Sequence, residues 1–110
     1  MNEVYLTGTI ESISVLQITE KGNAHLMLQV RVSHRNREKK IKHELYTVNA
    51  WNTLAAWANH ALKPGLSIVV RGYLTQRPAD NGPHTEVTAR YLIMTQPGSS
   101  VKEAQNLPES

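Results

Sequence analysis

Residues 44–74 read ELYTVNAWNTLAAWANHALKPGLSIVVRGYL, and the spacing of apolar residues changes twice within this stretch. In residues 45–51, one side of the chain carries Tyr46, Val48 and Ala50 and the other carries Leu45, Thr47, Asn49 and Trp51. This period of two is typical of a strand with one buried face. From residue 52 the apolar residues recur at three- and four-residue intervals, as in an amphipathic helix, until Pro64-Gly65 ends the pattern. Residues 68–74 then alternate again. The stretch therefore predicts a strand, a short helix and a second strand.

The predicted helix begins at a residue suited to a helix start. Asn52 stands where the period changes, and its side-chain oxygen can accept a hydrogen bond from a free amide of the first turn. We therefore predict Asn52 as the N-cap. Trp57 lies on the apolar stripe with Leu54, Ala58 and Ala61, so we expect its ring in the core, where it would seal one end of a barrel.

Three further segments alternate with the same period of two, and they cover residues 4–10, 26–32 and 85–94. Turn residues stand at Gly22-Asn23 and at positions 80–83. Three strands, a short helix and two more strands predict an all-β fold, a five-stranded Greek-key barrel with the helix between strands 3 and 4. This is the element order of the oligonucleotide/oligosaccharide-binding (OB) fold. Gly8 and Gly72 lie inside predicted strands and fit the sharp bends of so small a barrel.

The composition limits the chain to one domain. At 110 residues and 40% hydrophobic content it can fill one modest core, which we assign to residues 1–96. Residues 97–110 are polar and aperiodic, so we expect a short disordered C-terminal tail. No apolar run approaches the roughly 20 residues of a membrane helix, and residues 1–10 do not resemble a targeting segment. We expect a protein without membrane contact, in the cytoplasm or an organellar interior such as the plastid stroma.

The sequence gives little support to an enzyme. The absence of cysteine removes disulfides, thiolate nucleophiles and Cys-ligated zinc. The 5 histidines show neither His-Glu-x-x-His nor another close ligand pair. There is no nucleophile elbow and no Gly-rich phosphate loop. We therefore expect no catalytic residues, no metal, no cofactor and no small-molecule substrate.

Positive charge and flat side chains gather on one parity of the predicted strands and in one internal segment. The net charge is only +3, but residues 33–43 are strongly basic, with Glu38 as the acid among their cations. A nucleic-acid strand needs cations along its phosphates and rings for its bases. The candidate binding residues are Arg31, Arg35, Arg37, Lys39, Lys40, Lys42, Thr47, Asn49, Trp51, Arg71, Tyr73 and Arg77. The alternative is an ordinary solvated sheet face, with Trp51 against the helix and a basic hairpin that only aids solubility.

Several segments together resemble the bacterial single-stranded-DNA-binding (SSB) protein family. They are Asn-Glu-Val-Tyr-Leu-Thr-Gly at 2–8, Lys-Gly-Asn-Ala at 21–24, the helix with its Pro-Gly end at 54–65, Val-Arg-Gly-Tyr-Leu at 70–74 and Thr-Glu-Val at 85–87. They stand in the family's order over residues 2–96. The resemblance implies an OB barrel, single-stranded DNA as partner with RNA as a further candidate, and self-association as a homodimer or homotetramer.

The chain departs from the family pattern in two ways. At the places where family members stack bases it has Asn36 or its neighbours, Leu45, Trp51 and Ala79, so Trp51 alone keeps a ring. It also lacks the long tail with an acidic tip. Short, tail-less relatives include the SSB-like proteins of cyanobacteria and plastids and primosomal replication protein N.

Two functions follow from these observations. The first is sequence-tolerant, non-catalytic binding of single-stranded DNA in replication, recombination or repair. The alternative is an OB barrel that has lost its stacking residues and serves as a protein-protein interaction module. Salt dependence separates them, because phosphate binding releases counterions and an apolar interface does not.

Overall fold

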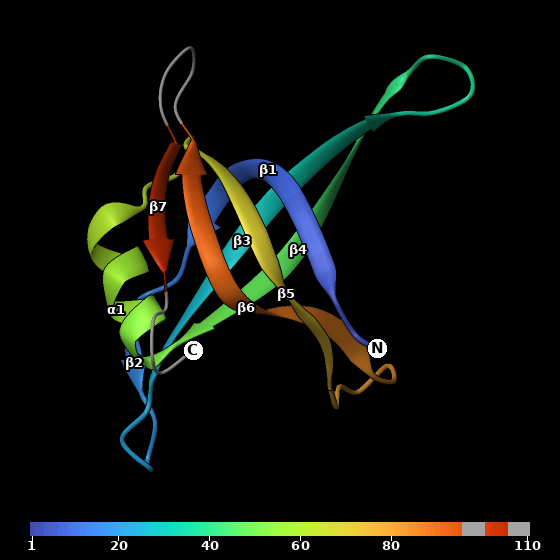
Figure 1. Ribbon diagram of the computed structural model, residues 1–110. Coiled ribbons are helices and arrows are strands. Elements are labelled where there is room, and N and C mark those ends of the chain that lie inside the picture. Colours follow the sequence, from blue (N-terminus) through green and yellow to red (C-terminus); the bar gives the residue numbers. More distant parts are fainter. Residues whose placement is uncertain (96–100, 106–110) are drawn as a thin grey trace.

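One continuous sheet curls on itself and is joined by one helix (Figure 1). The computed structural model describes residues 1–95, and residues 101–105 by their backbone alone. The elements are β1 Val4–Ile13, β2 Gln17–Ile18, β3 Ala24–Arg35, β4 Ile41–Trp51, α1 Asn52–Ala61, β5 Ser67–Arg77, β6 His84–Thr95 and β7 Val101–Gln105.

The barrel closes because β1 pairs with a different strand along each half of its length. Residues 4–9 of β1 pair antiparallel with β5, and residues 9–13 pair antiparallel with β3 across a bulge. The remaining neighbours are β5–β6, the parallel pair β6–β4, and β4–β3. The result is a closed five-stranded barrel with a short helix between its third and fourth strands, β4 and β5. This confirms the predicted OB fold, to which the structure adds the short β2.

The predicted parity of the core is confirmed for the inner part of the strands. Seven even-numbered side chains of β3, β4 and β5 are fully buried, namely Leu26, Leu28, Val30, Val48, Ala50, Ile68 and Val70. Tyr46 and Leu74 have the same parity but are exposed. In β6 the parity changes from odd to even, because the register between β5 and β6 shifts between Arg71 and Gly72. Trp57 is partly buried and packs against this core, as expected. The odd-numbered side chains of β4 and β5 are therefore on the outside of the barrel.

The predicted helix cap is wrong. Trp51, not Asn52, is the N-cap residue, and no side chain caps the helix. Asn52 has a positive φ of 52°, and its Oδ1 accepts a hydrogen bond from the Ala24 amide at 3.1 Å. The side chain thus ties the helix start to the first residue of β3. Sequence spacing identified where the helix begins, but the competing amide comes from 28 residues away.

The two strand glycines are needed where strands approach closely. A Cβ at Gly72 would overlap the carbonyl oxygen of Thr88 on β6, and a Cβ at Gly8 would overlap that of Arg31 on β3. Gly72 lies at the register shift between β5 and β6, and Gly8 lies where β1 passes from one partner to the other. Glycine permits both crossings because it has no side chain.

The C-terminal part of the chain adds a strand to the barrel's edge. Residues 101–105 form β7, which pairs antiparallel with residues 91–95 of β6. The expected disordered tail at 97–110 therefore includes a short paired segment, while positions 96–100 and 106–110 lie outside the described residues. In the part of the chain that is described, no helix has the length and apolar character needed to span a bilayer.

Candidate nucleic-acid interface

A hollow of about 390 Å³ opens on the outside of the barrel between the end of β4 and the hairpin of β5 and β6. Four predicted binding residues line it, Asn49 and Trp51 from β4 and Tyr73 and Arg77 from β5. They meet here because odd-numbered residues of both strands point outward. The strand between them, β6, pairs with both and adds the small side chain of Thr88 to the lining. The structure thus brings together two aromatic rings, one amide and one cation of the predicted set.

The Trp51 ring is stacked on a histidine. His25 lies directly opposite Trp51 in the β3–β4 ladder, and the two ring centroids are 4.3 Å apart with 28° between the planes. His25 Nε2 donates a hydrogen bond to Asn49 Oδ1 at 2.7 Å, which fixes the imidazole against the indole. The stack with His25 supports one side of the Trp51 ring. Because Trp51 is 38% exposed, the ring also remains open to a ligand.

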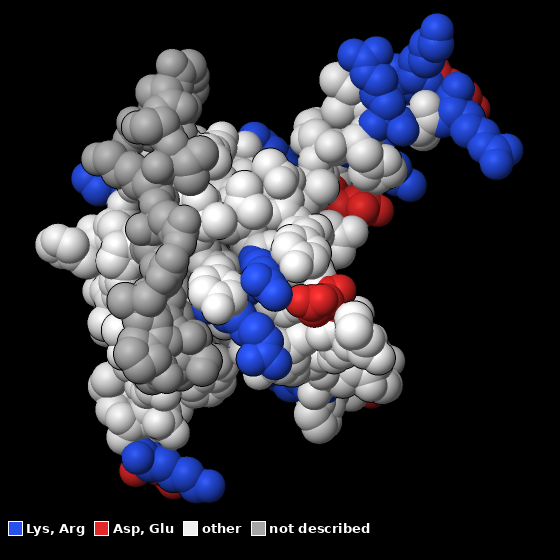
Figure 2. Space-filling model, in the orientation of Figure 1, with Lys and Arg blue, Asp and Glu red and all other residues white. Residues whose placement is uncertain are grey.

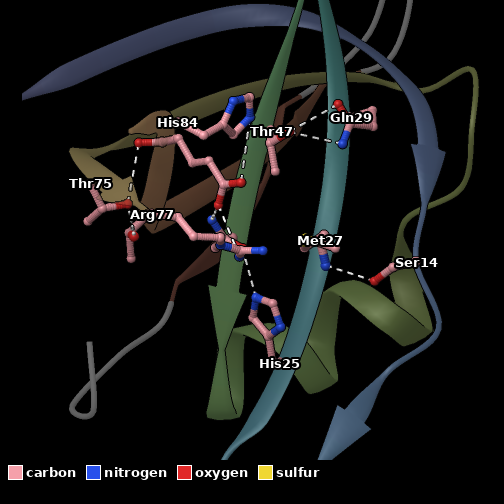
Figure 3. Close-up of polar contacts among 11 residues, drawn as sticks. Ser14, His25, Met27, Gln29, Thr47, Thr75, Arg77 and His84 are labelled. Carbon is pink, nitrogen blue, oxygen red and sulfur yellow. Dashed lines mark hydrogen bonds and ion pairs between the residues drawn. The ribbon is translucent and has the colours of Figure 1, made fainter. Parts of the chain in front are cut away.

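A buried carboxylate in the same hollow is linked through Asn49 to the stacked rings of Trp51 and His25. Glu86 is only 7% exposed. Its Oε1 accepts a hydrogen bond from Asn49 Nδ2 at 2.7 Å and forms an ion pair with Arg77 Nη2 at 3.1 Å. Its Oε2 faces His84 Nε2 at 3.7 Å. Figure 3 shows His25, Arg77 and His84 converging on this line of polar contacts from different strands. Sequence reasoning missed His25, His84 and Glu86.

The predicted basic segment forms a two-stranded arm that extends beyond the barrel (Figures 1 and 2). The β3–β4 ladder continues to the pair of Arg35 with Ile41. At the tip, Asn36 Oδ1 accepts hydrogen bonds from the backbone amides of Glu38 and Lys40, each at 3.0 Å. Opposite residues share a face of a sheet and successive residues alternate. Arg35 and Lys42 therefore present their charges on opposite faces of the arm.

The cations predicted to bind on the arm and those predicted on the barrel differ in their partners. Arg31 pairs with Glu11 at 3.0 Å, Arg71 with Glu3 at 3.1 Å and Arg77 with Glu86 at 3.1 Å. On the arm, Lys40 reaches Glu38 at 3.9 Å. Among the residues described, no acidic side chain lies within ion-pair distance of Arg35, Arg37, Lys39 or Lys42. Uncompensated positive charge is thus concentrated on the arm, as the blue surface at its tip in Figure 2 shows.

Two predicted arginines lie away from the hollow. Arg71 is placed over the rings of Tyr5 and Tyr91 at 5.5 and 5.3 Å, and the hydrogen bond with Glu3 raises its pKa above the ordinary value. Arg31 lies on β3, across from Thr9 of β1. Thr47 is on the outer face of β4, where it exchanges hydrogen bonds with Gln29. The predicted set therefore divides into the hollow, the arm and these separate positions.

Metal binding finds no support in this geometry. In residues 1–95, no three His, Asp or Glu side chains gather closely enough to hold an ion. The Glu86 carboxylate already accepts a hydrogen bond from the Asn49 amide and has its charge offset by the Arg77 guanidinium. What the hollow offers is a stacking ring, hydrogen-bonding groups and the guanidinium of Arg77. The basic arm extends from the opposite end of β4.

Comparison with known proteins agrees with this geometry. The model of the single-strand binding protein family matches residues 1–98. The chain belongs to this family. Among curated proteins no match was found.

Solved structures place this family member among short and long relatives. The single-stranded DNA binding protein of Thermus aquaticus superimposes with a TM-score of 0.71 at 29% identity, over 91% of this chain and 43% of that chain. This chain thus spans less than half of that relative's length. The protein priB from Ralstonia solanacearum has a TM-score of 0.65 at 13% identity, over 94% of this chain and 99% of that chain. At this identity, priB shows the shared fold alone.

Proposed function

We propose that this SSB-family member binds single-stranded DNA, laying one base on Trp51 while the β3–β4 arm contacts the phosphates. The observation that carries the proposal is the exposed Trp51 ring, held by His25 at the rim of a hollow and within an OB barrel of this family. Stacking on a ring accepts any base, because every base has a π-face. We therefore expect sequence-tolerant, non-catalytic binding. Its place would be replication, recombination or repair, in the cytoplasm or an organellar interior.

The Trp51→Ala variant tests the stacking step. We expect it to lose on the order of 1 to 3 kcal/mol of binding free energy for oligo-dT, with little change in salt dependence, because stacking releases no counterions. Fluorescence anisotropy of labelled oligo-dT at two salt concentrations measures both quantities.

Two controls separate stacking from support of the helix, which begins just after Trp51. The melting temperature of Trp51→Ala shows whether the barrel is intact, and Trp51→Phe should recover much of the affinity because it keeps a flat ring. Normal binding by Trp51→Ala would remove this ring from the interface. An absence of binding by the unaltered protein at low salt would instead favour the protein-interaction module.

We also predict self-association as a homodimer or homotetramer. Residues 4–8 of β1 pair with β5 along one edge, and among the described residues no strand pairs with their other edge. Tyr5, 62% exposed, and Thr7 lie along this part of the strand without adding charge, so little opposes edge pairing with a second copy. Sedimentation velocity at micromolar concentration should show a species larger than 12.3 kDa. Thr7→Lys should shift the distribution toward the monomer, and a monomer alone in the unaltered protein would contradict the prediction.

A further inference from the structure

Glu86 is an unexpected residue in a site that is to hold a polyanion. Its carboxylate is 7% exposed and lines the same hollow as Trp51. Burying a carboxylate is costly unless it is paired and hydrogen-bonded, and its charge opposes the approach of phosphates. Arg77 offsets that charge from one side. A side chain that only held Arg77 would not need to border the space where a ligand base would lie.

The two oxygens of Glu86 are unequally occupied. Oε1 has both close partners, a hydrogen bond from Asn49 Nδ2 at 2.7 Å and an ion pair with Arg77 Nη2 at 3.1 Å. Oε2 has His84 at 3.7 Å, which is beyond ordinary hydrogen-bond length. The hollow therefore presents a strong acceptor with capacity for a further donor.

The position of the ring and the acceptor determines what a base would meet. Trp51 and Glu86 border one hollow, and Asn49 connects them, accepting from the His25 that stacks on Trp51 and donating to Glu86. A base stacked on the exposed part of Trp51 would place an edge toward the inner side of the hollow. Carboxylates recognise the N4 amino group of cytosine, whereas thymine carries a carbonyl oxygen at the equivalent position.

We propose that this hollow receives one base of the bound strand and that Glu86 gives it a preference for cytosine over thymine. The inference rests on the proposed binding of single-stranded DNA and adds a base preference at one position. The amino group of cytosine donates to Oε2, whereas the thymine oxygen meets a buried negative charge. Because the carboxylate is already desolvated, a base that cannot donate leaves this acceptor without a partner.

The Glu86→Gln variant tests the proposal through a ratio of affinities. Oligo-dC and oligo-dT of equal length are titrated into unaltered and variant protein, and the dC-to-dT affinity ratio is compared between the two. We expect the ratio to fall about fivefold in Glu86→Gln, the lower end of the discrimination that one base-edge contact provides. Glu11→Gln, an identical change at an acid that pairs with Arg31 away from the hollow, should leave the ratio unchanged.

A second arm changes the ligand instead of the protein. Replacing the cytosines by 2-pyrimidinone removes the amino group and keeps the ring, so the unaltered protein should lose a similar factor, and Glu86→Gln should lose little. Equal loss of dC and dT affinity in Glu86→Gln would show that Glu86 only supports Asn49 and Arg77, which overturns the proposal. If Glu86→Gln binds both oligonucleotides with an unchanged dC-to-dT affinity ratio, the cytosine preference is overturned and the proposed binding of single-stranded DNA is not. Failure to bind either one would overturn the proposed function as well.

Discussion

The Gly72→Ala variant is expected to lose about 3 kcal/mol of its free energy of unfolding, the upper end of what overpacking commonly costs. The added Cβ would overlap the carbonyl oxygen of Thr88, and it would lie 3.0 Å from the Ala89 Cα. Both obstacles are backbone atoms of the paired strand, so no side chain can rotate away. The conflict can be relieved only by separating β5 from β6 at their register shift. Thermal unfolding should show a melting temperature lower by more than about 10 °C.

A second glycine provides the matched control. Gly82 has a positive φ of 102°, and a Cβ built there meets no heavy atom within 4 Å. The Gly82→Ala variant should therefore show only the conformational cost of a left-handed alanine, about 1–2 kcal/mol. Equal melting temperatures for the two variants would mean that the β5–β6 crossing is not as tight as the structure indicates.

The contrast between these glycines shows what the sequence could predict. The strands and the core follow from periodicity, because even-numbered residues such as Leu28 and Val48 fill a barrel with polar neighbours outside. Gly72 could be recognised as a special position inside a strand. Its reason, contact with the Thr88 carbonyl, depends on the register of β5 with β6 and cannot be obtained from either strand separately.

The same limit applies to the candidate site. Trp51 was found from the resemblance and from its outward parity, and the stack with His25 would follow from the β3–β4 register once the turn at Asn36 was placed. Glu86 gave no such signal, since it lies in a short family motif without a visible role. Only the parallel pairing of β4 with β6 brings its carboxylate to Asn49. A pairing across the closed barrel is set by tertiary geometry, so local pattern does not reveal it.

We expect the triple variant with Lys39, Lys40 and Lys42 replaced by alanine to bind single-stranded DNA about a hundredfold more weakly at 0.1 M salt. The slope of the logarithm of the binding constant against the logarithm of the salt concentration should become shallower by about 2. Each phosphate contact on a single strand contributes about 0.7 to this slope through counterion release. The arm is the place for this effect because the barrel arginines Arg31, Arg71 and Arg77 already have acidic partners. Oligo-dT titrations over a range of salt concentrations measure the slope directly.

The matched control removes exposed lysines that lie off the arm. Lys21 is in the turn between β2 and β3, and Lys63 follows α1, so Lys21→Ala with Lys63→Ala lowers the net charge without changing the arm. If general attraction of a basic protein for a polyanion governed binding, this double variant would flatten the slope in proportion to its lost charge. Direct phosphate contact instead requires that the slope change only in the arm variant. If the arm variant kept the salt slope of the unaltered protein, the phosphate contacts would lie on another surface. This conclusion would hold even if the protein still bound DNA and Trp51→Ala still weakened that binding.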